Sequence, residues 1–163
     1  HRIAERHHLI GPVMEQPQYN MFVRRKVEVE YADVYRTVGL GTTIWSPLAS
    51  GILTGKYNNG APADVRLKRE ELQWMADRLL TEANLEKIAA LGELAGDLGT
   101  SLAKLALAWC LKNPRVSTVL LGATKPSQLE ENLQAAEVVP LLTDEVMERI
   151  EGILDNAPDH PEY

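Results

Sequence analysis

Residues 116–132 read VSTVLLGATKPSQLEEN. The first six residues are β-branched or aliphatic apart from one serine. They predict a strand whose continuous apolar character is typical of burial on both faces. Residues 122–125 form a turn, and Pro126 fits the first position of a helix that we expect to run to about Glu137. A buried strand that leads through a glycine turn into a helix is the repeating unit of an α/β fold.

Two more strand–helix units precede this stretch. Residues 13–16 predict a short strand that Pro17 ends, and apolar spacing predicts a helix over 26–38 with Gly39 as its stop. Residues 41–46 predict a second strand, followed over 47–70 by a loop long enough to suggest a function. Further helices are predicted at 82–98, at 102–112 and from Thr143 to Leu154. Thr100 or Ser101 would cap the second of these helices.

The chain therefore carries three strands separated by helices, an order that implies a parallel sheet with right-handed crossovers. Three strands cannot close a barrel, which needs about eight. The chain opens on HRIAER, which is typical of the middle of a helix because no capping residue precedes it. We interpret residues 1–163 as one partial domain, the last part of a larger α/β fold, and expect residues 155–163 to form a frayed tail.

Composition excludes several classes of function. The 163 residues carry 23 acidic and 17 basic side chains, a net charge of -6, which argues against nucleic-acid binding. One cysteine, Cys110, allows neither an internal disulfide nor a four-thiolate zinc site, and we expect it to be a core thiol in a cytoplasmic protein. No apolar run reaches the roughly 18 residues needed to cross a bilayer, so we expect no direct membrane insertion.

The candidate binding residues lie in two strand-to-helix loops. The first, WSPLASG at 45–51, combines small residues with Lys56 and Arg66 downstream, which suit phosphate. The second, at 122–132, places a glycine turn at a helix N-terminus, where free N–H groups favour an anion. Glycine and a capping threonine also occur in such loops for geometry alone. The sequence holds no local dinucleotide fingerprint, Walker loop or serine elbow, and the adjacent His7 and His8 are poor joint metal ligands.

At these loops the sequence resembles the aldo-keto reductase superfamily, and more narrowly the branch that contains the β-subunits of voltage-gated potassium channels. The resemblance rests on EQPQYNMFVRRKVEVEY at 15–31, TIWSPLASGILTGKY at 43–57 and LALAWCLKNPRVSTVLLGATKPSQLEENLQA at 105–135. It implies the C-terminal half of a (β/α)8 TIM barrel, about the last three βα units, with NADPH (or NADP) as cofactor.

The resemblance also implies a cofactor role for each matching residue. Gln16 would contact the nicotinamide carboxamide and Trp45 would stack near the nicotinamide ring. The remaining residues would line the pyrophosphate (Ser46, Pro47, Leu48, Ala49, Gly51), meet cofactor phosphates (Lys56, Arg66), grip the adenosine 2′-phosphate region (Gly122, Thr124, Gln128) or contact the adenine (Glu131, Asn132). Simpler alternatives stay open: a core tryptophan, a strand-end glutamine, solvated loop charges and ordinary first-turn helix residues.

The family's catalytic Asp, Tyr, Lys and His lie on the first four strands, outside this chain, so we assign no catalytic residue and no metal ligand. The resemblance favours an NADPH-dependent reductase that converts small carbonyl compounds to alcohols. The first alternative is a regulatory β-subunit that docks, as a homo-tetramer, on the cytoplasmic domain of a potassium channel and uses NADPH as a redox sensor. The second is an inactive truncated fragment.

Overall fold

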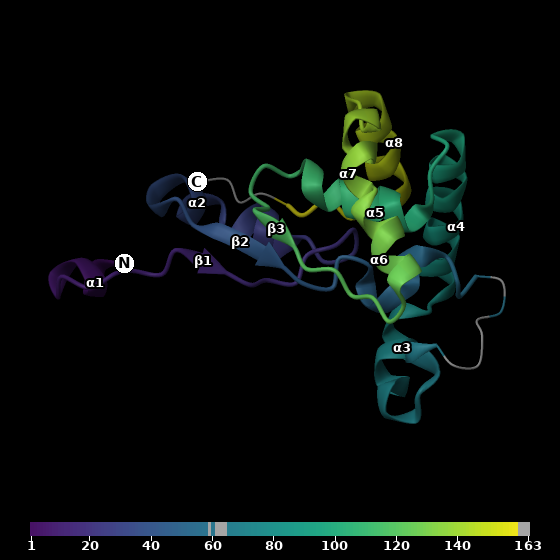
Figure 1. Cartoon of the computed structure of the whole chain (residues 1–163), viewed down its shortest axis with the longest axis horizontal. Helices are drawn as coiled ribbons and strands as arrows, with labels where there is room; N and C mark the ends of the chain where they lie inside the picture. The colour runs from purple at the N-terminus through teal and green to yellow at the C-terminus, as the bar shows by residue number, and fades with distance from the viewer. Residues whose placement is uncertain (59, 61–64, 160–163) are drawn as a thin grey trace.

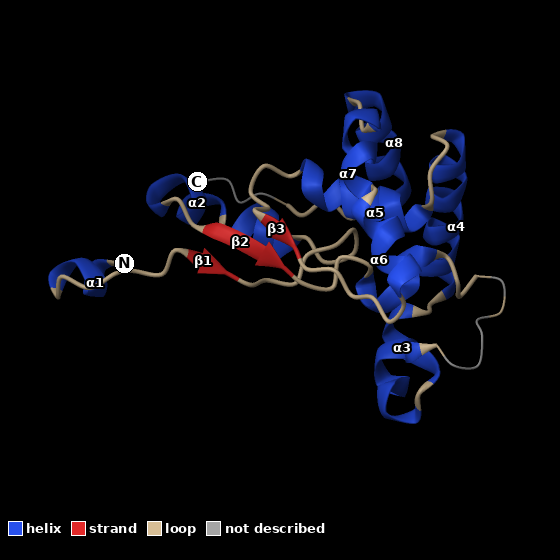
Figure 2. Cartoon of the chain, viewed as in Figure 1, coloured by secondary structure: helices blue, strands red, loops and turns tan. Residues whose placement is uncertain are grey.

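The computed structural model describes residues 1–58, 60 and 65–159. Three strands form a parallel sheet in the order β1 (Met14–Glu15), β2 (Gly41–Ile44), β3 (Thr118–Val119) (Figures 1 and 2). The sheet is parallel because each strand is followed by helical crossover segments that return the chain to the same end. This order confirms the α/β expectation for the described residues.

Most of the helices gather beside the carboxyl ends of the strands, whereas the first helix projects away at the opposite end (Figure 1). The α-helices are α1 (Arg2–Arg6), α2 (Ala32–Val38), α3 (Gln73–Leu79), α4 (Glu82–Asp97), α5 (Leu102–Lys112), α6 (Pro126–Leu133), α7 (Ala135–Val138) and α8 (Asp144–Leu154). A π-helical turn (Lys26–Glu30) precedes α2, and short 3-10 turns occur at Ala49–Thr54, Arg66–Lys68, Glu70–Leu72 and Val139–Leu141.

The helix ends follow the capping residues. The Ser101 side chain accepts a hydrogen bond from the Lys104 amide, and Thr143 does the same at the start of α8. Gly39 ends α2 with a φ of 66°, a conformation that glycine adopts without steric cost. In place of the single helix expected over 126–137 there are two, α6 and α7, because the helix is interrupted at Gln134.

Helix α5 is the centre of the core. Its apolar side chains are buried almost all round the helix, against α4, α7 and the Ala49–Thr54 turn. Ile44 of β2 belongs to the same buried cluster. Cys110 is fully buried in it, and burial raises the pKa of its thiol well above the ordinary range, which confirms the core thiol.

The expectation that residues 116–121 form a strand buried on both faces is wrong. Only Thr118–Val119 pair, and Leu120 is 38% exposed. The register puts Met14, Trp45 and Leu120 on one face of the sheet, and each is more than a third exposed. Strand β3 lies at a sheet edge and among the described residues this face has no packed layer, so apolar sequence alone does not bury the strand.

Two more expectations need correction. Residues 47–70 contain 3-10 turns where a plain loop was expected, and residues 59 and 61–64 lie outside the described ones. In the segment expected to fray, Asn156 is held by hydrogen bonds: it donates to the Met21 carbonyl and accepts from Arg24. Residues 160–163 lie outside the described part.

No single helix within the described ranges is long and apolar enough to span a membrane. Helices α4 and α5 meet the length and composition test only as a pair, and they are bent by 89° relative to each other.

Candidate functional site

A cleft of about 1090 Å³ opens at the carboxyl ends of the strands, where parallel α/β sheets bind ligands. Both predicted turns line it, although more than 70 residues separate them in the sequence. The cleft takes in every predicted site residue except Gln16: Trp45, Ser46, Pro47, Leu48, Ala49, Gly51, Lys56, Arg66, Gly122, Thr124, Gln128, Glu131 and Asn132.

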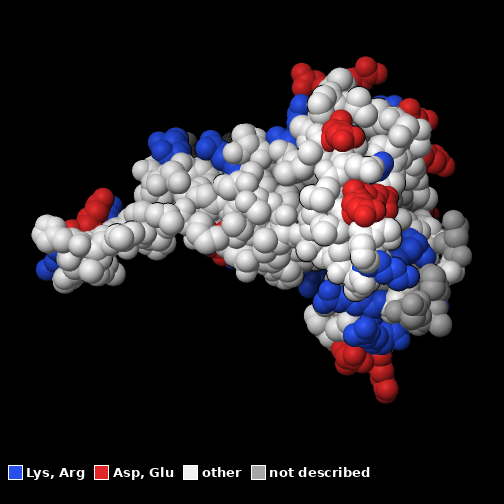
Figure 3. All heavy atoms as spheres, viewed as in Figure 1, with Lys and Arg blue, Asp and Glu red and all other residues white. Residues whose placement is uncertain are grey.

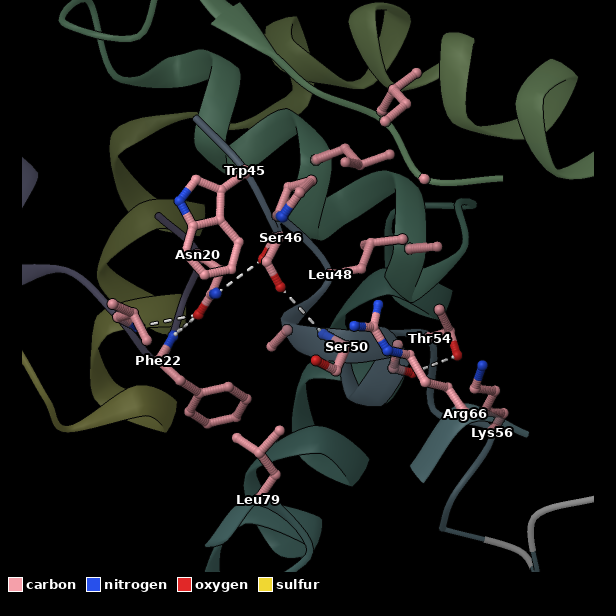
Figure 4. Close-up of a pocket in the computed structure, with 18 of the residues that line it drawn as sticks. Asn20, Phe22, Trp45, Ser46, Leu48, Ser50, Thr54, Lys56, Arg66 and Leu79 are labelled. Atoms are coloured by element: carbon pink, nitrogen blue, oxygen red, sulfur yellow. Dashed lines mark hydrogen bonds between the residues drawn. The ribbon is translucent and has the colours of Figure 1, made fainter. Parts of the chain in front are cut away.

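The first turn has a backbone that side chains ordinarily avoid. Ser46, Ala49 and Ser50 have φ values of 55°, 46° and 60°, and Gly51 follows at 91°. Non-glycine residues in this region cost of order 1–3 kcal/mol each and cluster at ligand sites. The surrounding structure imposes them here, because the Ser46 carbonyl accepts from Asn20 Nδ2 at 2.9 Å and Ser50 N donates to Ser46 Oγ at 3.3 Å (Figure 4).

Trp45 stands at one end of the cleft (Figure 4). Its side chain is 45% exposed, so the alternative of a core tryptophan is wrong. Its backbone is fixed by pairing with the segment after β1: Trp45 N donates to the Pro17 carbonyl at 3.0 Å, and Tyr19 N donates to the Trp45 carbonyl. A rigidly held, half-exposed aromatic face is well suited to stack on a planar ligand ring.

Lys56 and Arg66 lie together toward the other end of the same view (Figure 4). The Lys56 Nζ crosses directly over the glycine of the turn, since a Cβ added to Gly51 would lie 2.9 Å from it. Gly51 is therefore required for its positive φ, whereas the flexible end of Lys56 could move aside for a Cβ. The same ammonium lies 5.3 Å from the centre of the Tyr57 ring.

The cleft is positively charged in a chain of net charge -6. Among the described residues, four cationic side chains line it, Lys56, Arg66, Arg78 and Lys87, against one carboxylate, that of Glu131. Figure 3 shows Lys and Arg gathered around α3 and the neighbouring loop, whereas Asp and Glu dominate over α7 and α8. This distribution favours an anionic ligand in the cleft.

The second turn is closed by its own side chains. Gln128 Oε1 accepts from Thr124 N at 2.8 Å and from Thr124 Oγ1 at 3.1 Å, which links the turn to the first residues of α6. Glu131 accepts a 2.7 Å hydrogen bond from Ser101, and Asn132 is 6% exposed. Glu131 thus links α6 to the start of α5, and both residues line the cleft; they lie near the end of α6, not in its first turn as the simpler alternative supposed.

Gln16 is not brought to the cleft. Glu15 points toward the helical side, where it pairs with Lys26, so Gln16 is exposed on the open sheet face that it shares with Trp45. The cleft begins at Gln18, two residues further on, where Gln18 pairs with Trp45.

Sequence reasoning missed several lining residues. The most consequential is Asn20, which is fully buried and bonded to the first turn. An asparagine just beyond a strand end is a weak signal, because its bonding partner lies 26 residues away. Others come from the loop after β1 and from α3 and α4, which the sequence did not place beside the cleft: Phe22, Trp74, Met75, Arg78, Leu79 and Lys87.

The site has binding groups but no evident catalytic pair. Across residues 1–58, 60 and 65–159 no cluster of His, Cys, Asp and Glu could hold a metal ion. Tyr19 does not line the cleft: its hydroxyl donates to Glu28 and accepts from Asn113, and burial strongly raises its pKa. The geometry suits recognition of an extended anion with a planar end.

The profile of the Aldo/keto reductase family matches residues 1–155. The chain belongs to the aldo/keto reductase family. It is 50% identical over 160 residues to a probable voltage-gated potassium channel subunit beta of Arabidopsis thaliana, covering 98% of this chain and 49% of that protein. A protein with the same description from Oryza sativa subsp. japonica is 50% identical over 161 residues, with the same coverage.

These matches confirm the resemblance stated from the sequence, both to the family and to the channel-subunit branch. The chain spans about half the length of the curated relatives it matches. The three-stranded parallel sheet is consistent with part of a barrel.

Proposed function

We propose that this chain forms the NADPH-binding half of a (β/α)8 barrel that reduces small carbonyl compounds in the cytoplasm. The observation that carries the proposal is the shared cleft: the two turns expected to hold one phosphorylated dinucleotide line the same cavity, together with four cationic side chains. The open sheet face at Met14, Trp45 and Leu120 is where the rest of a barrel would pack.

The residues present fit the cofactor. A volume of about 1090 Å³ is large enough for a dinucleotide. Its lining offers different chemistry in different places, a half-exposed tryptophan at one end and the cations Lys56 and Arg66 toward the other (Figure 4). Lys56 and Arg66 would form charge-assisted hydrogen bonds with phosphate oxygens, the strong class of such bonds.

The chain's own residues bind and orient rather than react. Trp45 would hold a planar ring against the sheet edge, and the 46–51 turn would present its backbone to the pyrophosphate. NADPH supplies hydride when bound. The described lining offers no group placed as a proton donor to the carbonyl oxygen, so general acid catalysis must come from the missing half.

Isothermal titration tests the binding proposal. The 163-residue chain is titrated with NADPH and then with NADH, which lacks the 2′-phosphate. Tighter binding of NADPH is expected, because the 2′-phosphate adds negative charge to a cationic cleft. Equal affinity would exclude a 2′-phosphate site here, and no binding of either would refute the cofactor role.

A turnover assay separates the reductase from an inactive fragment. The 163 residues alone should not oxidise NADPH with 4-nitrobenzaldehyde, whereas the protein completed by its preceding half should. Turnover by the isolated chain would show that its own residues suffice for catalysis. A completed protein that binds NADPH without turnover would point to a sensor.

We also propose a role as a regulatory subunit of a potassium channel, because both relatives carry that description and match 98% of this chain. Co-purification of the completed protein with a channel's cytoplasmic domain, as a fourfold assembly, would support it. If the protein does not associate with the channel domain but retains reductase activity, the channel role is refuted and only the enzymatic role remains.

A further inference from the structure

We propose that Asn20 is a positioning residue for the cofactor, because its side-chain amide holds the first turn in its left-handed conformation before any ligand arrives. This inference rests on the proposed function, since it concerns the same cleft. It adds a residue from outside both turns to the machinery of the site.

Asn20 is locked in place on all sides. It is fully buried, and its Oδ1 accepts from Phe22 N and Val23 N, both at 3.0 Å. Its backbone exchanges two hydrogen bonds with Val23, at 3.2 and 3.0 Å. Because these bonds fix the amide plane, the N–H directions of Nδ2 are fixed too, and along one of them it donates to the Ser46 carbonyl at 2.9 Å (Figure 4).

Ser46 needs this restraint more than an ordinary residue does. Its φ of 55° is uncommon for serine, and it precedes Pro47, which sterically restricts the residue before it to extended backbone. The Ser46 carbonyl accepts from Ala49 N at 3.0 Å as well as from Asn20, so both lone pairs are used. Without the Asn20 bond, the backbone would relax toward an extended conformation.

The neighbouring residue is held from the same segment. Tyr19 N donates to the Trp45 carbonyl and Asn20 Nδ2 donates to the Ser46 carbonyl, so residues 19 and 20 bind two consecutive carbonyl groups. The segment is itself fixed, since Asn156 donates to the Met21 carbonyl at 2.9 Å. The orientation of the Trp45 ring and of the 46–51 turn therefore depends on hydrogen bonds from the fixed segment 19–21, including the one from the Asn20 side chain.

The test compares two isosteric variants. Asn20→Asp keeps the Oδ1 acceptor but replaces the Nδ2 donor with an oxygen that faces the Ser46 carbonyl. Asn58→Asp is the matched control, because Asn58 Nδ2 also donates to a backbone carbonyl, that of Leu85, at 2.7 Å, and Asn58 does not line the cleft. Each variant is titrated with NADPH and with adenosine 2′,5′-bisphosphate, which lacks the nicotinamide half.

Asn20→Asp should weaken NADPH binding by at least about tenfold, since it removes a buried hydrogen bond and opposes two oxygens. Adenosine 2′,5′-bisphosphate should bind as before, because it needs only the second turn and the cations, and Asn58→Asp should change neither ligand. Unchanged NADPH affinity would overturn the inference. Equal loss of both ligands would also overturn it, because that result describes general destabilisation.

Backbone chemical shifts of the ligand-free chain give a second readout that does not depend on the proposed function. In the parent chain and in Asn58→Asp, Ser46 should show the shifts of a positive φ, and in Asn20→Asp it should lose them. Retention of those shifts in Asn20→Asp would refute the positioning role. If the parent chain binds no NADPH but Ser46 loses these shifts in Asn20→Asp, the proposed function is refuted and the positioning role of Asn20 stands.

Discussion

Replacing Arg24 with alanine should destabilise the chain more than any change at the surface. Its guanidinium pairs with Glu28 at 3.0 Å and Glu151 at 2.6 Å, donates to Asn156 and lies 5.2 Å from the centre of the Trp109 ring. It thereby joins the end of α8 to the segment that carries Asn20. The alanine variant removes all four contacts together.

The magnitude follows from how well each partner is solvated. The Arg24 and Glu28 side chains are 9% and 16% exposed, so the variant leaves a largely buried carboxylate without its cation, bonded only to the Tyr19 hydroxyl among the described residues, which costs about 3–5 kcal/mol. The Glu151 side chain is 34% exposed and regains water, so its share is below about 1 kcal/mol. We expect a total loss of about 3–6 kcal/mol of unfolding free energy.

Urea unfolding followed by circular dichroism measures this loss. Arg36→Ala is the control, because Arg36 and Asp33 form an ion pair whose side chains are both 72% exposed, and should cost less than about 0.5 kcal/mol. Adding Glu28→Gln to Arg24→Ala should recover part of the loss by removing the stranded charge. An Arg24→Ala loss below about 1 kcal/mol, or no recovery in the double variant, would refute the reasoning.

Further predictions concern tyrosines and cleft cations. Tyr35→Phe should leave the unfolding free energy unchanged or higher, because the Tyr35 hydroxyl is buried without a hydrogen-bond partner among the described residues. Tyr19→Phe should cost about 1–3 kcal/mol in the same urea assay, because it loses two hydrogen bonds. Burial raises the pKa of Tyr35 to about 12 from 10.0, so the stability that Tyr35 contributes below pH 10 should be lost as the pH rises toward 12. A pH series of melting temperatures should therefore show a smaller fall in Tyr35→Phe than in the parent chain. An identical fall in both would contradict this prediction. Lys56→Ala and Arg66→Ala, each titrated by calorimetry, should weaken NADPH more than NADH; equal losses would count against contact with the 2′-phosphate.

Local chemistry made much of the fold predictable. Ser101 and Thr143 marked helix starts, and Gly39 and Pro126 marked a stop and a start, because capping and proline geometry act within a few residues. The two turns were identified for the same reason: glycine, small residues and cations follow directly after strands. Their meeting in one cleft follows from the parallel sheet, which places all the carboxyl ends at one edge.

What the sequence did not predict depends on distant partners. The exposure of Leu120 is decided by the absence of a packed layer among the described residues, not by its own apolar character. Gln16 was assigned by resemblance; it lies on the same sheet face as Trp45, but the cleft lining begins only at Gln18, two residues further along the chain. Asn20 escaped notice because the bond that matters reaches across to Ser46.

The most direct test of the account is an NMR titration of the 163-residue chain with NADPH, following the backbone amides of residues 46–51 and 122–132 together. If one dinucleotide bridges the two turns, both sets of signals should shift along a single binding curve with one dissociation constant. Signals that move in only one turn, or that follow two different constants, would contradict a shared cofactor site.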